Sequence, residues 1–238
     1  GDSQAAALYA WNAQMSAAFM VPLHICEVTV RNAVSEALER VHGPRWPWQT
    51  GFQASLPSVP AHIGYSPRDD LQKVANEQPT TGKVIPELKF VFWEQMFTKR
   101  HDLRLWNAHI KSIFPEHLPS MTVRDLRKRI YSDLDAIRKL RNRIAHHEPI
   151  FKRNLAEEFN RILELVRLRS LLVESWLTAN QQVLELDSLA PVFRGGLRWA
   201  PSHAEIATQA YRLWIEGGRS SDSAQADWFA AKRLLGVP

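Results

Sequence analysis

The sequence predicts an all-α protein, and three observations carry this prediction. Apolar side chains recur at spacings of three and four through most of the chain. No segment alternates between apolar and polar residues as a half-buried strand does. Prolines, glycines and capping residues fall at the ends of the apolar stretches, where helices begin and end. At 238 residues the chain can hold one generous domain, or one domain and a small appendage.

The N-terminal region predicts two successive helices. The first begins at a capping residue near the N-terminus. Pro22 then opens a second helix, because proline costs nothing at the first helical position, and Gly43 ends it. Residues 44–67 hold five prolines together with Trp46 and Trp48. They indicate an irregular segment anchored by aromatic side chains rather than a flexible linker.

The central region predicts several more helices. Ser66 followed by Pro67 is a start signal, and Thr122 followed three residues later by Asp125 is another. The helix after Thr122 carries a long apolar stripe that ends at Ile144. The expected helical ranges are 67–77, 86–98, 101–113 and 155–185, together with the helix that starts at Thr122 and carries its stripe through Ile144.

A break in composition separates residues 1–190 from a small module at 202–238. Pro191 and the pair Gly195-Gly196 interrupt the helical pattern between them. Two short helices, Ala204–Glu216 and Ala224–Leu235, follow the break and resemble a short bacterial helical-hairpin module of unknown function. Because about 37 residues rarely fold alone, we expect the hairpin to dock on the main domain, a partner chain or another protein.

The segment 141–150 carries more chemistry than folding requires. It places a guanidinium, an amide and two imidazoles within seven residues. Pro149 cannot continue a helix and pushes Glu148 out of the α region. In an ideal helix Arg141 and His146 lie roughly 140° apart around the axis. They therefore converge only if the last turn unwinds, or if a two-fold dimer places two copies of this helix face to face.

Arg141 and Asn142, followed after four intervening positions by His146, resemble the motif of HEPN-domain ribonucleases. The wider segment Leu140–Asn154, reading LRNRIAHHEPIFKRN, resembles the Abi-like (abortive infection) branch of that family. Residues 27–32 and 87–93 look like the same branch, and the likeness covers about residues 1–185. The resemblance implies an all-helical, dimeric enzyme that cuts RNA without a metal or cofactor.

The resemblance also implies a role for each residue of the motif. Cleavage by the ribose 2′-hydroxyl needs a proton acceptor, a proton donor and positive charge on the phosphorane. Imidazole titrates near neutral pH, and guanidinium binds phosphate in a bidentate fashion. We expect Arg141, His146 and Asn142 to be catalytic. We expect supporting roles for His147, Glu148, Glu27, Arg31 and Asn32, and RNA contacts from Arg138, Lys139, Arg143, Lys152 and Arg153.

Plainer interpretations of the same residues stay open. Cations are favoured at any helix C-terminus by the helix dipole. A HEPN-like module that binds RNA or nucleotide without cutting it is a second alternative, and a purely helical interaction protein is a third. A metal site is not expected, because adjacent histidines do not share one ion and the single Cys26 allows no cysteine pair.

Composition and the resemblance together complete the expectation. The net charge of +5 suits an anionic partner, although charge alone is a weak indicator. No uninterrupted run of about 18 apolar residues exists, which argues against a membrane span. We expect a cytoplasmic, homodimeric endoribonuclease that acts on RNA as a toxin-like effector in phage defence. A protein antitoxin or regulator is its expected protein partner.

Overall fold

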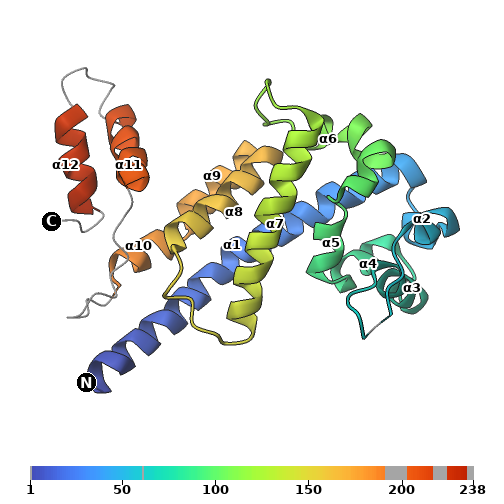
Figure 1. The fold of residues 1–238 in the computed structure, drawn as a ribbon, viewed down its shortest axis with the longest axis horizontal. Coiled ribbons are helices and arrows are strands. Elements are labelled where there is room, and N and C mark those ends of the chain that lie inside the picture. Colours follow the sequence, from blue (N-terminus) through green and yellow to red (C-terminus); the bar gives the residue numbers. More distant parts are fainter. Residues whose placement is uncertain (1, 61, 191–202, 217–223, 235–238) are drawn as a thin grey trace. The chain divides into compact units, whose positions relative to one another are not determined.

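The computed structural model describes residues 2–60, 62–190, 203–216 and 224–234 (Figure 1). Every regular element in these ranges is helical, which confirms the all-α class. The chain forms two compact units. The first comprises the described residues of Gly1–Ala17, Ile150–Ala156 and Gln182–Pro238. The second comprises those of Ala18–Pro149 and Glu157–Gln181.

The α-helices are α1 (Asp2–His42), α2 (Thr50–Ser55), α3 (Pro67–Glu77), α4 (Thr81–Glu87), α5 (Phe90–Gln95), α6 (Asn107–Ile113), α7 (Val123–Ala145), α8 (Leu155–Arg169), α9 (Leu171–Asn180), α10 (Val183–Ser188), α11 (His203–Glu216) and α12 (Ala224–Leu234). Three short turns complete the described structure. They are the 3₁₀ helices η1 (Trp46–Trp48) and η2 (Lys99–His101), and the π-helical turn η3 (Asp102–Trp106).

Helix α1 runs through Pro22 without interruption, so the predicted boundary at this proline is wrong. Proline inside a helix removes one backbone hydrogen bond and costs about 3 kcal/mol relative to alanine. The stripe of buried side chains nevertheless continues across it, from Met15 and Phe19 to Leu23 and Cys26. Burying each of these side chains contributes roughly 1.5–3 kcal/mol, which outweighs the missing bond.

The predicted helix 86–98 is divided, because α4 ends at Glu87 and α5 begins at Phe90. Leu88 and Lys89 between them have extended backbone. Both Leu88 and Phe90 are buried. A continuous helix would point these two side chains about 200° apart, whereas extended backbone points residues i and i+2 the same way. Packing of both side chains therefore favours the break.

Two other predicted helices are also segmented. The range 101–113 contains the π-helical turn η3 before α6. The range 155–185 is divided into α8, α9 and the start of α10. The first of these breaks lies at Ser170, whose hydroxyl accepts a hydrogen bond from the Val173 amide at 3.3 Å and caps α9. A local cap of this kind competes with continuation of the preceding helix.

Aromatic side chains fill much of the core of the second unit. Trp46 packs edge-on against Trp93 and stacks near Phe92, and its indole N–H donates to the Ser35 hydroxyl at 3.1 Å. Phe97 stacks on Trp106 with ring centroids 4.5 Å apart. The segment 44–67 is therefore anchored by aromatic contacts as predicted, although it also contains η1 and α2.

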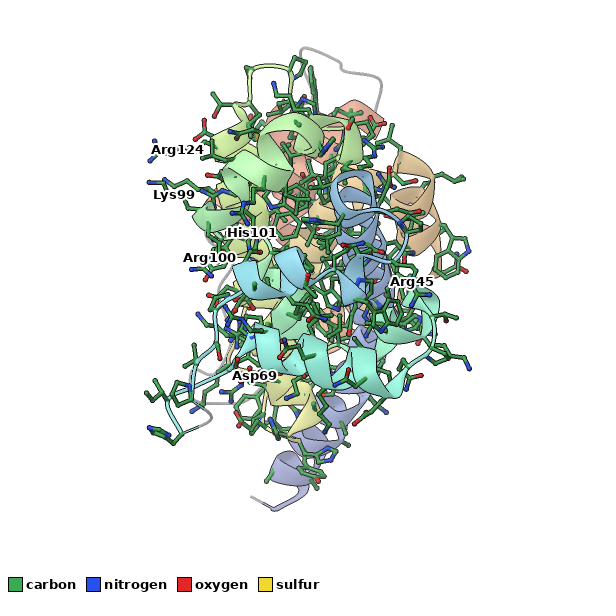
Figure 2. All side chains as sticks on the ribbon, turned by 90° about the vertical axis from the view of Figure 1, so that its right-hand side faces the viewer. Arg45, Asp69, Lys99, Arg100, His101 and Arg124 are labelled. Carbon is green, nitrogen blue, oxygen red and sulfur yellow. The ribbon has the colours of Figure 1, made fainter. Side chains whose placement is uncertain are left out.

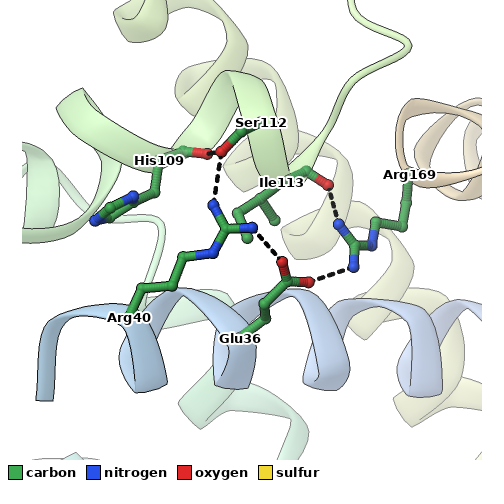
Figure 3. A network of polar contacts seen from close by, with 6 residues as sticks. All are labelled: Glu36, Arg40, His109, Ser112, Ile113 and Arg169. Atoms are coloured by element: carbon green, nitrogen blue, oxygen red, sulfur yellow. Dashed lines mark hydrogen bonds and ion pairs between the residues drawn. The ribbon is translucent and has the colours of Figure 1, made fainter. Parts of the chain in front are cut away.

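Ion pairs tie α1 to α6 and α8 in the second unit (Figure 3). Glu36 of α1 pairs with Arg40 one turn along and with Arg169 at the end of α8. Arg40 also donates to the Ser112 hydroxyl at 2.8 Å, and Arg169 donates to the Ile113 carbonyl. The C-terminal half of α1 is thereby fixed against two helices that are distant in sequence.

One described helix, α1, is long and apolar enough to cross a membrane by length and composition alone, between Ala5 and His42. Polar residues interrupt its apolar runs, so a search for uninterrupted runs does not find it. The buried stripe along α1 supplies part of this apolar character.

Specific polar contacts hold the first unit together. The Trp11 indole N–H donates to the Leu186 carbonyl at 2.8 Å, and the Asn12 side chain accepts from the Ile150 amide at the same distance. Helices α11 and α12 form a pair with its own small core, made by Ile206, Ala210, Leu213, Trp228 and Ala231. The two predicted C-terminal helices therefore form, and position 235 lies outside the described residues.

Candidate functional site

Helix α7 carries the segment that the sequence singles out. The Thr122 hydroxyl accepts from the Asp125 amide at 3.1 Å, which confirms the predicted N-cap. Over its 23 residues the helix buries one continuous stripe. The members of this stripe are Leu126, Ile130, Leu134, Ile137, Leu140 and Ile144. Because the buried stripe runs to the last turn, it fixes the direction in which the residues after Leu140 face.

The C-terminus of α7 ends in a Schellman motif. The Glu148 amide donates to the Arg143 carbonyl at 2.8 Å, and the His147 amide donates to the Ile144 carbonyl at 3.1 Å. His147 has φ of 56° and is the single non-glycine residue with positive φ in the described chain. Glycine usually occupies this left-handed position, so a histidine here costs backbone energy.

Arg143 holds in place the residues that follow helix α7. Its Nε and Nη2 donate to the Pro149 carbonyl at 3.2 and 2.7 Å, and its Nη1 lies 3.1 Å from Glu148 Oε2. An apolar contact commonly links these two positions of a Schellman motif, and here an ion pair takes its place. Two residues predicted to bind RNA or support catalysis therefore have a local structural role.

Arg141 and His146 are both exposed, and neither side chain has a hydrogen-bond or ion-pair partner among the described residues. The His146 amide still donates to the Asn142 carbonyl at 2.9 Å, so the helical register persists to this point. Of the two routes by which His146 could meet Arg141, unwinding of the last turn is therefore not present. Within one chain the two side chains leave α7 on faces roughly 140° apart. Half-buried Asn142 lies one turn before His146, on the same face.

The predicted RNA-contacting cations one turn earlier are paired with carboxylates. Arg138 binds the buried Glu94 of α5 and also Asp135, the latter at 2.8 Å. Lys139 binds the other oxygen of Asp135 at 2.6 Å. Burial raises the pKa of Glu94, and the hydrogen bond from Lys139 lowers the pKa of Asp135. Arg141, by contrast, is left with its guanidinium available.

The other expected site residues lie elsewhere. Glu27 and Arg31 form the ion pair that their spacing predicts, on α1. The neighbouring Cys26 is fully buried, and its pKa is raised by burial, by Glu27 and by Asp133 of α7. Asp133 precedes Arg141 by about 12 Å along α7. The Glu27–Arg31 ion pair, which lies beside Cys26, is therefore nearer the middle of α7 than its C-terminal end.

The last three predicted site residues, Asn32, Lys152 and Arg153, lie on α1 and in the segment after Ile150. Asn32 is exposed on α1, one residue after Arg31. Lys152, which is exposed, and Arg153, which is half-buried, belong to the first unit. Arg153 also donates its amide to the Ile150 carbonyl at 3.0 Å.

Several buried charges escaped sequence reasoning. Asp133 is 7% exposed and lies between Arg161 of α8, at 2.9 Å, and Arg129, at 3.6 Å. Burial raises the pKa of Asp133, and Arg161 opposes the effect. Arg129 lies one turn before Asp133 on α7, a spacing that is visible in the sequence, whereas Arg161 reaches Asp133 through packing of α8 against α7, which no local pattern reports. Within the described ranges, no three histidine, cysteine, aspartate or glutamate side chains are placed to hold a metal ion.

Comparison with known proteins concerns the C-terminal pair of helices. Residues 201–236 match a family model described as a protein of unknown function (DUF2934). The match includes the described helices α11 and α12 and none of the residues around Arg141. Searches of curated proteins and of solved structures find no match to this chain.

Proposed function

We propose that this protein is a metal-independent endoribonuclease that resembles the Abi-like HEPN enzymes. One observation carries the proposal: Arg141 and His146 are exposed without internal partners, at the end of a helix whose other nearby cations are neutralised. A guanidinium left unpaired beside paired neighbours suits binding of an external phosphate. The Schellman motif and the hydrogen bonds from Arg143 to the Pro149 carbonyl fix the backbone next to both groups.

The proposed reaction needs only side-chain chemistry. His146 removes the proton of a ribose 2′-hydroxyl, which attacks the adjacent phosphorus. Arg141 stabilises the negative charge that develops on the phosphorane oxygens. A second protonated imidazole then gives its proton to the departing 5′-oxygen. The products are a 2′,3′-cyclic phosphate and a 5′-hydroxyl end, and DNA is inert because it lacks the nucleophile.

A second copy of the chain completes the site in this proposal. One chain places Arg141 and His146 on different faces of α7, and one imidazole does not serve as both base and acid in a single step. A two-fold axis beside the end of α7 brings two guanidiniums and two imidazoles around one cleft. The homodimer is thus part of the mechanism.

A non-catalytic RNA- or nucleotide-binding module is the second candidate. The separation of Arg141 and His146 around α7 favours it, because a binding surface does not require the two groups to converge. In either case we propose a cytoplasmic protein that acts on RNA. The catalytic version acts as a toxin-like effector in phage defence and is restrained by an antitoxin or regulator protein.

Cleavage of purified RNA in the presence of a chelator tests the proposal. We expect Arg141→Ala and His146→Ala each to lower the cleavage rate by at least about 100-fold, since removing a proton carrier or a charge stabiliser has this effect. Arg141→Lys should rescue little, because lysine offers no planar pair of donors. The wild-type products should carry cyclic phosphate ends.

Matched controls use exposed residues away from the motif. Lys128→Ala on α7 and His62→Ala remove the same charge or ring and should retain full cleavage. Wild-type activity in either motif variant refutes the site. If RNA binding is saturable and salt-sensitive but no cyclic phosphate products form, the result supports the non-catalytic binding module and not the enzyme.

A further inference from the structure

A second candidate site lies at the opposite end of α7, where the chain passes from α5 into η2. An open cavity of about 320 Å³ is lined there by Leu56, Pro67, Gln95, Met96, Lys99 and His101, among others. Its volume is at the low end of the range typical of small-molecule sites, about 300–1,000 Å³. Leu56, Pro67 and Met96 are buried, so most of the lining surface is apolar.

The rim of the cavity is cationic. Lys99 and Arg100 are exposed, and neither has a carboxylate partner among the described residues. The nearest acid in sequence, Asp102, is occupied by the buried Arg127 of α7, whose Nε lies 2.6 Å from Asp102 Oδ1. Positive charge at the rim is therefore not neutralised locally.

Arg124 adds a third cation from α7. It lies one turn before Arg127, on the same face of the helix, and Arg127 contacts both Asp102 and the Phe97 carbonyl at 2.8 Å. Figure 2 shows Lys99 and Arg124 extending from the same edge of the molecule, with Arg100 beside them and His101 further inward. Cations from two elements thus lie toward the same side of the molecule in this view.

His101 supplies a polar group inside the cavity. The side chain is 7% exposed, and its ring nitrogens have no hydrogen-bond partner in the described structure. The two ring nitrogens are not fully enclosed by protein atoms, and the residue lines the cavity. A ligand in the cavity can therefore reach them. A buried polar group normally has a partner, and a bound ligand provides one here.

The backbone around the cavity is also irregular. The 3₁₀ turn η2 passes directly into the π-helical turn η3. Single π turns recur at functional sites, because the extra residue re-aims neighbouring side chains. From Arg124 to the end of α7 at Ala145 the helix spans about 31 Å, which separates this cavity from the Arg141 and His146 segment.

We propose that this cavity binds a nucleoside phosphate, either a free nucleotide or one nucleotide of an RNA strand. Lys99 and Arg100 contact the phosphate, and His101 donates to or accepts from it or the sugar. The base lies on the apolar floor, where the thioether of Met96 contacts its ring. The half-buried Gln95 amide, whose side chain has no hydrogen-bond partner among the described residues, faces the base edge. An inorganic anion would leave the apolar floor unused.

Titration of the whole protein with adenosine monophosphate, in phosphate-free buffer at low salt, tests the proposal. Calorimetry gives the affinity, and the proton spectrum of the His101 ring reports where the ligand binds. A parallel titration uses a short RNA whose 2′-hydroxyls are methylated, so that binding is read without cleavage. We expect Lys99→Ala with Arg100→Ala to weaken binding at least tenfold and the His101 signal to shift in the wild type.

The matched control removes the same charge elsewhere in the second unit, with Lys83→Ala and Lys111→Ala, both exposed. If the protein binds the mononucleotide and only the variant with Lys99→Ala and Arg100→Ala weakens this binding, the ligand is a free nucleotide. If the protein binds only the RNA, and the same variant alone weakens that binding, the ligand is one nucleotide of an RNA strand. No binding of either probe, equal weakening by the control, or an unmoved His101 signal overturns the proposal. These readouts do not depend on whether the protein cuts RNA.

Discussion

His147 shows how much one backbone angle constrains the candidate site. Its φ of 56° is costly for a side chain with a Cβ, by roughly 1 kcal/mol, and glycine removes that cost. We therefore expect His147→Gly to raise the free energy of unfolding by about 1 kcal/mol and His147→Val to lower it by at least that much. Urea denaturation of both variants measures the effect.

The same pair of variants separates structure from chemistry. If the His147 imidazole supports catalysis, His147→Gly loses cleavage activity while it gains stability. If only the backbone turn matters, the glycine variant cleaves RNA as well as the wild type. His62→Gly, at an exposed position without positive φ, should not gain stability, and an equal gain there would contradict the strain argument.

His101 gives a prediction about pH at the residue scale. Burial, together with Arg100 and Arg104, lowers its pKa from 6.5 to about 4. The unfolded chain therefore takes up this proton first, and stability falls as pH drops from about 6.5 toward 4. Over that window the wild type should lose about 2–3 kcal/mol more than His101→Gln, which has no ring to protonate. Equal losses in chemical denaturation would remove His101 as the cause.

At the scale of elements, Arg127 links α7 to the η2–η3 segment. It is buried, pairs with Asp102 at 2.6 Å and donates to the Phe97 carbonyl. We expect Arg127→Ala to cost about 3 kcal/mol, because it leaves a half-buried carboxylate and a carbonyl without partners. Replacing both residues, with Arg127→Met and Asp102→Leu, should cost clearly less than the single change. A double variant that is worse than the single one would rule out an uncompensated charge as the cause.

Hydroxyl caps predicted helix starts correctly, whereas a proline did not. Ser66 and Thr122 both cap helices where the sequence placed them, because a cap depends on a hydroxyl and an amide three residues apart. Pro22 misled the prediction, since packing along α1 outweighs the missing hydrogen bond. The break at Leu88 follows from burial of Leu88 and Phe90 on one side, and that requires the core against which they pack.

At the scale of the whole molecule, the helical class was predictable from periodicity, while the candidate site was predictable only as a short segment. The sequence placed Arg141 and His146 at a helix end but left open whether unwinding of the turn or a two-fold dimer brings them together. The Schellman motif depends on a left-handed backbone conformation at His147. Glycine usually marks such a position, and because the sequence has histidine there, the motif was not predictable. Pairing of Arg138 with Glu94 joins helices 44 residues apart and was likewise not visible.

Complementation between two inactive variants tests the composite site directly. In a mixed dimer of Arg141→Ala and His146→Ala chains, the shared cleft keeps one Arg141 from one copy and one His146 from the other. Each parent homodimer lacks both copies of one of these groups. If the two groups act across the two-fold axis, the mixed dimer should therefore regain part of the cleavage activity that both parents lack. Co-expression with two affinity tags isolates the mixed dimer for the RNA assay.

The predicted recovery separates three arrangements. If Arg141 and His146 serve the same phosphate within one chain, every cleft of the mixed dimer lacks one group and activity stays near zero. If the protein does not dimerise, mixing changes nothing, and the sedimentation coefficient reports a monomer. The roughly 140° between the two side chains on α7 makes the shared cleft the arrangement that this helix geometry favours. An inactive mixed dimer of intact subunits would therefore contradict the composite site while leaving the helical fold unaffected.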